Sequence, residues 1–116
     1  MLFVCYPKCT TCQKAAKWLE AHGLSYEFRD IKQNRPTEDE LRLWILKSGL
    51  PIKRFFNTSG LQYKALDLKN RLPSMTEEEM IALLSTDGML VKRPILISGD
   101  TVLVGFREPD WENALI

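Results

Sequence analysis

The sequence predicts an α/β protein in which a mixed four-stranded sheet is flanked by helices. A strand–helix–strand pattern occupies the first 31 residues, and a β-hairpin followed by a helix closes the chain. Strands joined through a helix run parallel, whereas hairpin strands run antiparallel, so the sheet combines both pairings. The 116 residues are enough for one domain spanning 1–116, with a helical insertion at about 35–88 between the two halves.

The composition is that of an ordinary globular protein. Apolar residues make up 45% of the chain and charged residues 27%, and the net charge is +1. This balance gives no reason to expect direct nucleic-acid binding through a broad basic face. No apolar run is long enough to cross a membrane, and no signal peptide is recognisable. Three cysteines without an export signal favour a reducing cytoplasm, where a disulfide is transient and functional.

The first three elements form the expected βαβ unit. The apolar run Leu2–Tyr6 ends at a proline, as a buried strand does. Apolar residues then recur at helical spacing from Thr10 or Thr11, and the pair His22-Gly23 predicts the end of that helix. The segment Tyr26–Ile31 alternates apolar and polar residues, which indicates a second strand parallel to the first.

Two capping boxes mark helices within the insertion. Thr37–Glu40 predicts the start of a helix that ends near Gly49, and Thr76–Glu79 predicts one that ends at Asp87-Gly88. The mixed segment Ile52–Leu72 between them favours short helices.

The last third predicts a hairpin and a final helix. Pro94–Ser98 and Thr101–Gly105 form two strands around a tight turn. The final helix starts near Glu108 and contains Trp111, Ala114 and Leu115. The three tryptophans occur at helical spacing with other apolar residues, so we interpret them as packing residues.

The most informative motif is the pair Cys9 and Cys12, at the point where the first strand gives way to the helix. A helix N-terminus favours negative charge, and the thiolate is the nucleophilic form of cysteine. Cys12 follows one helical turn later, within reach to close a disulfide with Cys9. This spacing predicts redox chemistry. Thr10 and Thr11 could donate hydrogen bonds to the sulfur or cap the helix, and the cap is the favoured interpretation.

The cysteines have two other interpretations. A zinc site needs a second ligand pair, but the chain offers only Cys5 and a single histidine, His22, so no metal is expected. Cysteines can also be inert small hydrophobes, and Cys5, inside the first strand, fits that description.

Several separated motifs resemble one known family when they are taken together. Tyr6-Pro7-Lys8-Cys9, then Arg93-Pro94-Ile95, then Gly105-Phe106-Arg107 occur in the order found in the ArsC arsenate reductases and the Spx regulators. The resemblance implies a thioredoxin-like fold with Pro94 in the cis form opposite the reactive cysteine. It also implies that Cys9 is the nucleophile, that Arg93 and Arg107 bind an anion, and that no organic cofactor is needed.

Two departures from the family pattern separate the functional hypotheses. Asn57 stands where ArsC enzymes have an anion-binding arginine, with Arg54 as a nearby substitute, and Cys12 is more typical of Spx or of glutaredoxins. One hypothesis is a thiol oxidoreductase in which Cys9 attacks arsenate or a mixed disulfide and Cys12 resolves the adduct. Its reductant would be glutathione with glutaredoxin, or thioredoxin. The alternative is an Spx-like redox switch that binds the RNA polymerase alpha subunit without turnover.

Overall fold

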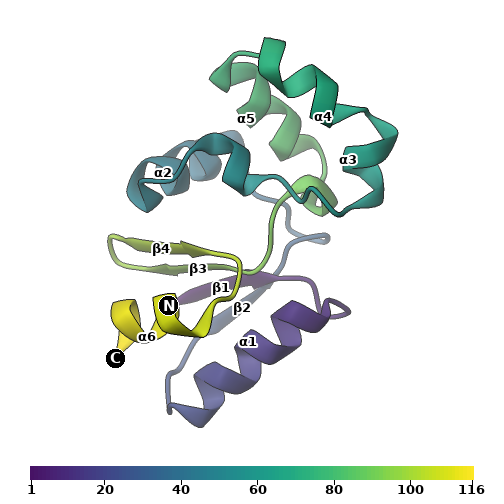
Figure 1. Cartoon of the computed structure of the whole chain (residues 1–116). Helices are drawn as coiled ribbons and strands as arrows, with labels where there is room; N and C mark the ends of the chain where they lie inside the picture. The colour runs from purple at the N-terminus through teal and green to yellow at the C-terminus, as the bar shows by residue number, and fades with distance from the viewer.

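A four-stranded mixed sheet forms the centre of the computed structural model, which describes all 116 residues. The strands are β1 (Leu2–Cys5), β2 (Glu27–Asp30), β3 (Ile95–Ser98) and β4 (Thr101–Val104). Their order across the sheet is β2-β1-β3-β4 (Figure 1). Strands β1 and β2 are parallel, whereas β3 is antiparallel to both β1 and β4. The predicted fold class is therefore confirmed.

Helices cover both faces of this sheet. Helices α1 (Thr10–Ala21) and α6 (Glu108–Leu115) pack on one face (Figure 1). The insertion between β2 and β3, called the helical segment below, packs on the other face. That segment contains α2 (Glu38–Ser48), α3 (Leu61–Ala65), α4 (Leu68–Arg71) and α5 (Glu77–Thr86), with 3₁₀ turns at Ile52–Phe55, Leu72–Ser74 and Gly88–Leu90. None of these helices combines the length and the apolar character needed to cross a membrane.

The alternation of side chains along β1 divides the interior into two cores. Phe3 and Cys5 point to the side of α1, whereas Val4 points to the helical segment. Residues on β3 divide in the same way, with Leu96 on the α1 side and Ile95 on the other. The site described below lies at the carboxyl end of β1, where the chain passes from the sheet into α1.

Aromatic side chains close the core under α1 and α6. The Trp111 indole meets the rings of Phe3, Trp18 and Phe106 edge to face. Its Nε1 donates a buried hydrogen bond of 3.0 Å to the carbonyl oxygen of Gly105. Trp111 is thus the packing residue that the sequence indicated. The short helix α6 packs mainly through Trp111, and Ala114 is exposed.

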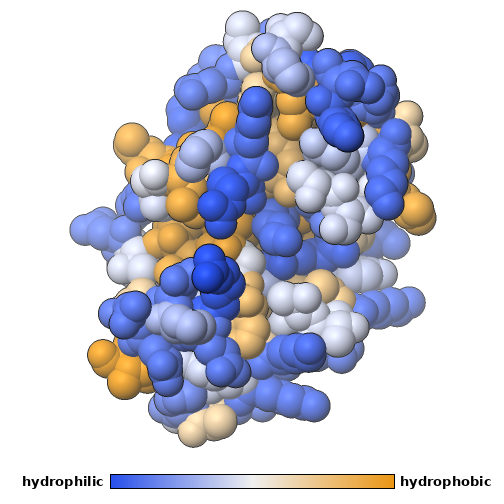
Figure 2. Space-filling view, in the orientation of Figure 1, coloured by the Kyte–Doolittle hydropathy of each residue, from blue (hydrophilic) through white to orange (hydrophobic).

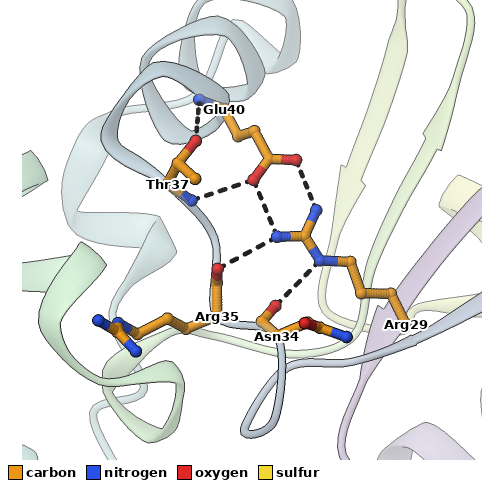
Figure 3. Close-up of polar contacts among 5 residues, drawn as sticks. All are labelled: Arg29, Asn34, Arg35, Thr37 and Glu40. Atoms are coloured by element: carbon orange, nitrogen blue, oxygen red, sulfur yellow. Dashed lines mark hydrogen bonds and ion pairs between the residues drawn. The ribbon is translucent and has the colours of Figure 1, made fainter.

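Both predicted capping boxes are present, and the first is joined to the sheet. The Thr37 hydroxyl accepts a hydrogen bond from the Glu40 N–H, and the Glu40 carboxylate accepts one from the Thr37 N–H. The same carboxylate pairs with the Arg29 guanidinium of β2 (Figure 3). Arg29 also donates to the carbonyl oxygens of Asn34 and Arg35, so one side chain fixes the path from the sheet edge into α2.

A single glycine brings the helical segment close to the sheet. A Cβ atom at Gly88 would lie 1.8 Å from the Ile31 carbonyl oxygen, which is too close for any side chain. Only glycine allows this approach of the two backbones. The end of α5 is therefore seated directly against the chain that leaves β2.

Replacing Glu40 with glutamine should lower the free energy of unfolding by about 1–2 kcal/mol at pH 7, because it removes the ionic partner of Arg29. Arg29 and the Thr37 backbone N–H hold the pKa of Glu40 below its usual value. The wild-type advantage should therefore be present above about pH 4.3, the usual glutamate pKa, and disappear as the pH falls through the lowered pKa.

Urea denaturation of Glu40→Gln and wild type between pH 3 and pH 7 measures this advantage. Glu38→Gln, an exposed change in the same helical turn, is the matched control. An equal loss of stability in both variants would show that Arg29 does not stabilise the fold through Glu40.

Candidate functional site

Cys9 is the N-cap residue of α1. Its backbone is extended, with φ −82° and ψ 122°, and its carbonyl oxygen accepts a 3.0 Å hydrogen bond from the Gln13 N–H as the helix begins. The Cys9 N–H donates to the Tyr6 carbonyl oxygen at 2.9 Å, which closes a turn with Pro7 at its second position. The Gln13 side chain donates to the Pro7 carbonyl oxygen at 2.9 Å and fixes the turn to the helix. Backbone geometry therefore holds Cys9 at the helix N-terminus.

Thr10 and Thr11 do not cap the helix, so that prediction is wrong. Both lie inside the first helical turn with exposed side chains, and no side chain caps the helix. The reason is that the turn closed by Tyr6 ends at Cys9, which leaves the cysteine itself in the N-cap position.

The first turn of α1 is suited to negative charge at Cys9. N–H groups of a first helical turn lack intrahelical partners, and the helix dipole adds partial positive charge there. The first turn contains no acidic residue that would offset this field. Cys9 is half-buried, so part of the residue is accessible to solutes. This arrangement can hold a thiolate or the negative charge that develops when the sulfur is attacked.

Cys12 is buried on the inner face of α1, with 2% of its surface exposed. The Tyr6 N–H donates to Cys12 Sγ at 3.4 Å. Hydrogen bonding with the Cys5 thiol and burial raise the pKa of Cys12 well above its ordinary value, although the Tyr6 N–H and the Cys9 side chain act in the opposite direction. Cys12 therefore stays a protonated thiol in the reduced protein while its neighbour Cys9 remains accessible.

The structure brings a third thiol, Cys5, to this site, although its place inside a strand is typical of an inert core residue. Cys5 lies at the end of β1, is 3% exposed, and lines the same small cavity as Cys12. The sequence does indicate part of this arrangement, because the two-residue spacing of Phe3 and Cys5 places both side chains on one face of the strand. The sequence did not show that this face is covered by α1 rather than by the helical segment.

The peptide bond between Arg93 and Pro94 is cis, the geometry that the resemblance implies. It precedes β3, the strand paired with β1, and so brings Arg93 beside the first turn of the chain. The Arg93 guanidinium lies over the Tyr6 ring, 5.5 Å from its centre. Its Nε and Nη1 atoms are buried and have no hydrogen-bond partner. Two unpaired donors on a permanently charged group can bind an anion.

Arg93 borders a pocket of about 450 Å³. The other lining residues come from the 3₁₀ turn before β3, from the loop before α3 and from the first residues of α3: Asn57, Ser59, Gly60, Leu61, Gln62 and Met89. Arg93 is the one charged residue among them, and Asn57 uses its side-chain amide to donate to the Met89 carbonyl oxygen at 3.4 Å. The pocket therefore offers one cation surrounded by neutral polar groups.

The two remaining candidate arginines lie outside this pocket. Arg54 borders a separate cavity formed with β4 and Trp111, so it does not stand in for the arginine that Asn57 replaces. Arg107 is largely exposed and pairs with Asp110 at 3.7 Å, at the start of α6. The structure thus gathers Cys9, Cys12 and Arg93 around Tyr6 and leaves Arg107 apart.

Nowhere in the chain do three or more His, Cys, Asp or Glu side chains gather to hold a metal ion.

The fold and the site define a thioredoxin-like protein with a cysteine pair at the start of its first helix. The chain belongs to the ArsC family, because the family model matches residues 5–114.

Related proteins include one of regulatory function and solved structures of the same family. The chain is 55% identical to an ArsC family related protein from Bacteroides fragilis, with a TM-score of 0.95 and coverage of 97% of this chain and 94% of the other. It is 41% identical to a possible arsenate reductase from Streptococcus mutans, with a TM-score of 0.87 and 96% of both chains covered. It is 30% identical to the regulatory protein MgsR of Bacillus subtilis over 91% of this chain and 82% of MgsR.

Stability should fall in alkaline solution because of Cys12. Its pKa is raised in the folded protein, so above the unfolded thiol pKa of about 8.5 the unfolded chain binds fewer protons than the folded one. The contribution is complete below that pH and is lost at up to about 1.4 kcal/mol per pH unit above it.

Urea denaturation between pH 7 and pH 9.5, with a phosphine reductant present, measures this slope. The slope should be shallower in Cys12→Ala, and the difference between the two proteins reports Cys12 alone. Equal slopes in the two proteins would contradict the raised pKa.

Proposed function

We propose that this chain is a thiol–disulfide oxidoreductase with Cys9 as nucleophile and Cys12 as resolving thiol. The observation that carries the proposal is the buried, unpartnered Arg93 guanidinium next to the turn that presents Cys9. An anion-binding group beside a helix-capping thiolate suits a substrate that is negatively charged and is attacked by sulfur. The free cysteines and the transient nature of such a disulfide suit a reducing cytoplasm.

The substrate best suited to the pocket is the disulfide of a low-molecular-weight thiol that bears a carboxylate. The pocket has one guanidinium among neutral side chains, and its volume of about 450 Å³ is within the range of small-molecule sites. A carboxylate can pair with a single arginine, and peptide-like amides can bond to the neutral groups. A tetrahedral oxyanion such as arsenate carries more charge on less volume, and Asn57 supplies no second cation.

The reaction consists of two sulfur exchanges. The Cys9 thiolate attacks one sulfur of the substrate disulfide, forms a mixed disulfide and releases the other half as a thiolate. Cys12 then loses its proton, attacks the Cys9 sulfur and releases the second half, which leaves the Cys9–Cys12 disulfide. The substrate gains two electrons and the cysteine pair loses two. An external thiol reductant, such as thioredoxin or glutathione with glutaredoxin, restores the pair.

The α1 N-terminus and Arg93 act on different parts of this reaction. Helix N–H groups stabilise negative charge on Cys9 before attack and when Cys9 is a leaving group. Arg93 orients the substrate through its carboxylate and does not touch the reacting sulfur atoms in this scheme. Losing Arg93 should therefore weaken substrate binding more than it slows the exchange.

Arg93→Gln should raise the KM for oxidised glutathione about 10-fold or more, with kcat changed only a few-fold, because a charge-assisted hydrogen bond contributes about 1.5–3 kcal/mol. Reduced glutathione released in the presence of an excess of a dithiol reductant measures the turnover.

Arg107→Gln is the matched control, since it removes the same charge from an exposed position outside the pocket. An unchanged KM in Arg93→Gln, or a larger rise in Arg107→Gln, would show that the anion is bound elsewhere. A parallel reaction with arsenate tests the other substrate. Arsenite production at a rate above that of glutathione release would make arsenate the substrate and overturn the pocket assignment.

A regulatory role is the second candidate, and the observation in its favour is the similarity to MgsR. In that case the Cys9–Cys12 disulfide would alter the affinity for a protein partner, and the RNA polymerase alpha subunit is the partner to test. Calorimetric titration of that purified subunit with reduced and with oxidised protein distinguishes the two roles. Redox-dependent binding without glutathione turnover would favour the switch, whereas turnover without binding favours the enzyme.

A further inference from the structure

Cys5 lies beside the resolving thiol with no assigned role. It ends β1 and is almost fully buried, and together with Cys12 it lines an apolar cavity of about 190 Å³. The aromatic side chains of Phe3, Tyr26 and Phe28 also border this cavity. Phe28 is 49% exposed, so the cavity lies near the surface along the β2 edge of the sheet.

Cys12 is the central member of the three thiols. It belongs to the same core cluster as Cys5, with Cys9 packed against that cluster, and its sulfur accepts a hydrogen bond from the N–H of Tyr6, the residue after Cys5. A disulfide is exchanged when a third sulfur approaches one of its two sulfur atoms. In a Cys9–Cys12 disulfide, Cys5 is the one remaining cysteine of the chain, and it lines the same small cavity as Cys12.

We propose that Cys5 is a third redox thiol, which accepts the disulfide from the Cys9–Cys12 pair. The Cys5 sulfur loses its proton and attacks Cys12 Sγ, so that a Cys5–Cys12 bond forms and the Cys9–Cys12 bond breaks. Cys9 leaves as a thiolate at the helix N-terminus and can take up a proton from solvent. The exchange moves no electrons to or from the protein and needs no other reactant. The proposal rests on the proposed function, because that reaction supplies the first disulfide.

This exchange would separate the substrate-binding thiol from the stored disulfide. The Cys5–Cys12 disulfide would lie in the apolar cavity, while Cys9 would regain its free sulfur at the surface. A dithiol reductant would then reopen the bridge at Cys12. Because Cys5 is almost fully buried in a packed core, its side chain has little room to move, and the second exchange should be slower than closure of the Cys9–Cys12 bond.

The arrangement of lysines makes the two disulfides easy to distinguish. Trypsin cleaves after Lys8 and Lys14, which separates residues 1–8, with Cys5, from residues 9–14, with Cys9 and Cys12. A Cys9–Cys12 disulfide stays within one peptide, whereas a Cys5–Cys12 disulfide joins the two peptides. The reduced full-length chain would be mixed with one equivalent of oxidised glutathione, blocked with N-ethylmaleimide at successive times, digested and analysed by mass spectrometry.

The expected result is an early peptide 9–14 with an internal disulfide, followed by joined peptides that carry N-ethylmaleimide on Cys9. Fragmentation between Thr10 and Thr11 shows which cysteine carries the label. The proposal is overturned if the internal disulfide forms and Cys5 remains fully labelled at all times, in which case the proposed function still stands. Absence of the internal disulfide at every time would instead contradict the proposed function.

Two variants isolate the Cys5 step. Cys9→Ser leaves Cys5 and Cys12 as the only cysteines, and diamide, a thiol oxidant, should join them and remove most of their labelling. Cys5→Ala should abolish the joined peptides and retain the internal disulfide. The N-ethylmaleimide labelling of the wild-type protein tests the proposal without either variant. The proposal therefore remains testable if Cys5→Ala fails to fold. Full labelling of both thiols in folded, diamide-treated Cys9→Ser would contradict the proposal.

Discussion

The contact of Cys12 with the end of β1 is the interaction on which the rest of the site depends. Through it, the inner face of α1 is held against the strand, with the Tyr6 N–H donating to the Cys12 sulfur. The contact holds the first turn of α1 beside Tyr6, whose carbonyl oxygen closes the turn that leaves Cys9 at the N-cap. A small, polarisable side chain is suited to that position, because a larger one would move the helix away from the strand.

The two halves of the chain each supply part of the site. The βαβ half presents Cys9 on a turn, and the hairpin half brings Arg93 beside it through a cis peptide bond and the pairing of β3 with β1. Tyr6 lies between them, with its carbonyl oxygen bonded to Cys9 and its ring under Arg93. The helical segment contributes the neutral wall of the pocket, including Asn57. Substrate selection therefore depends on the helical segment, whereas the sulfur chemistry depends on the sheet. Figure 2 shows one face of the molecule, with hydrophobic side chains gathered across its middle and mostly hydrophilic ones above and below them.

Local patterns predicted the elements well, and the contacts between elements much less. The capping boxes at Thr37 and Thr76 define their own helices, because both partners lie within four residues. The cap of α1 was missed because it depends on where a turn closes. The position of Arg54 and the contact of Cys5 with Cys12 depend on which elements pack together, and alternation along one strand does not reveal that. The similarity to ArsC proteins suggested the cis bond before Pro94, which no local pattern specifies.

The most direct test of the central claim is to trap the intermediate of the sulfur exchange. Reduced Cys12→Ser and wild-type protein would each be mixed with oxidised glutathione and followed by intact-mass and peptide mass spectrometry. The account predicts that Cys12→Ser accumulates one glutathionyl group on Cys9, whereas wild type passes through that adduct to an internal disulfide without bound glutathione. A stable glutathionyl adduct on Cys9 in wild type, or an adduct at another cysteine in Cys12→Ser, would contradict the assigned roles.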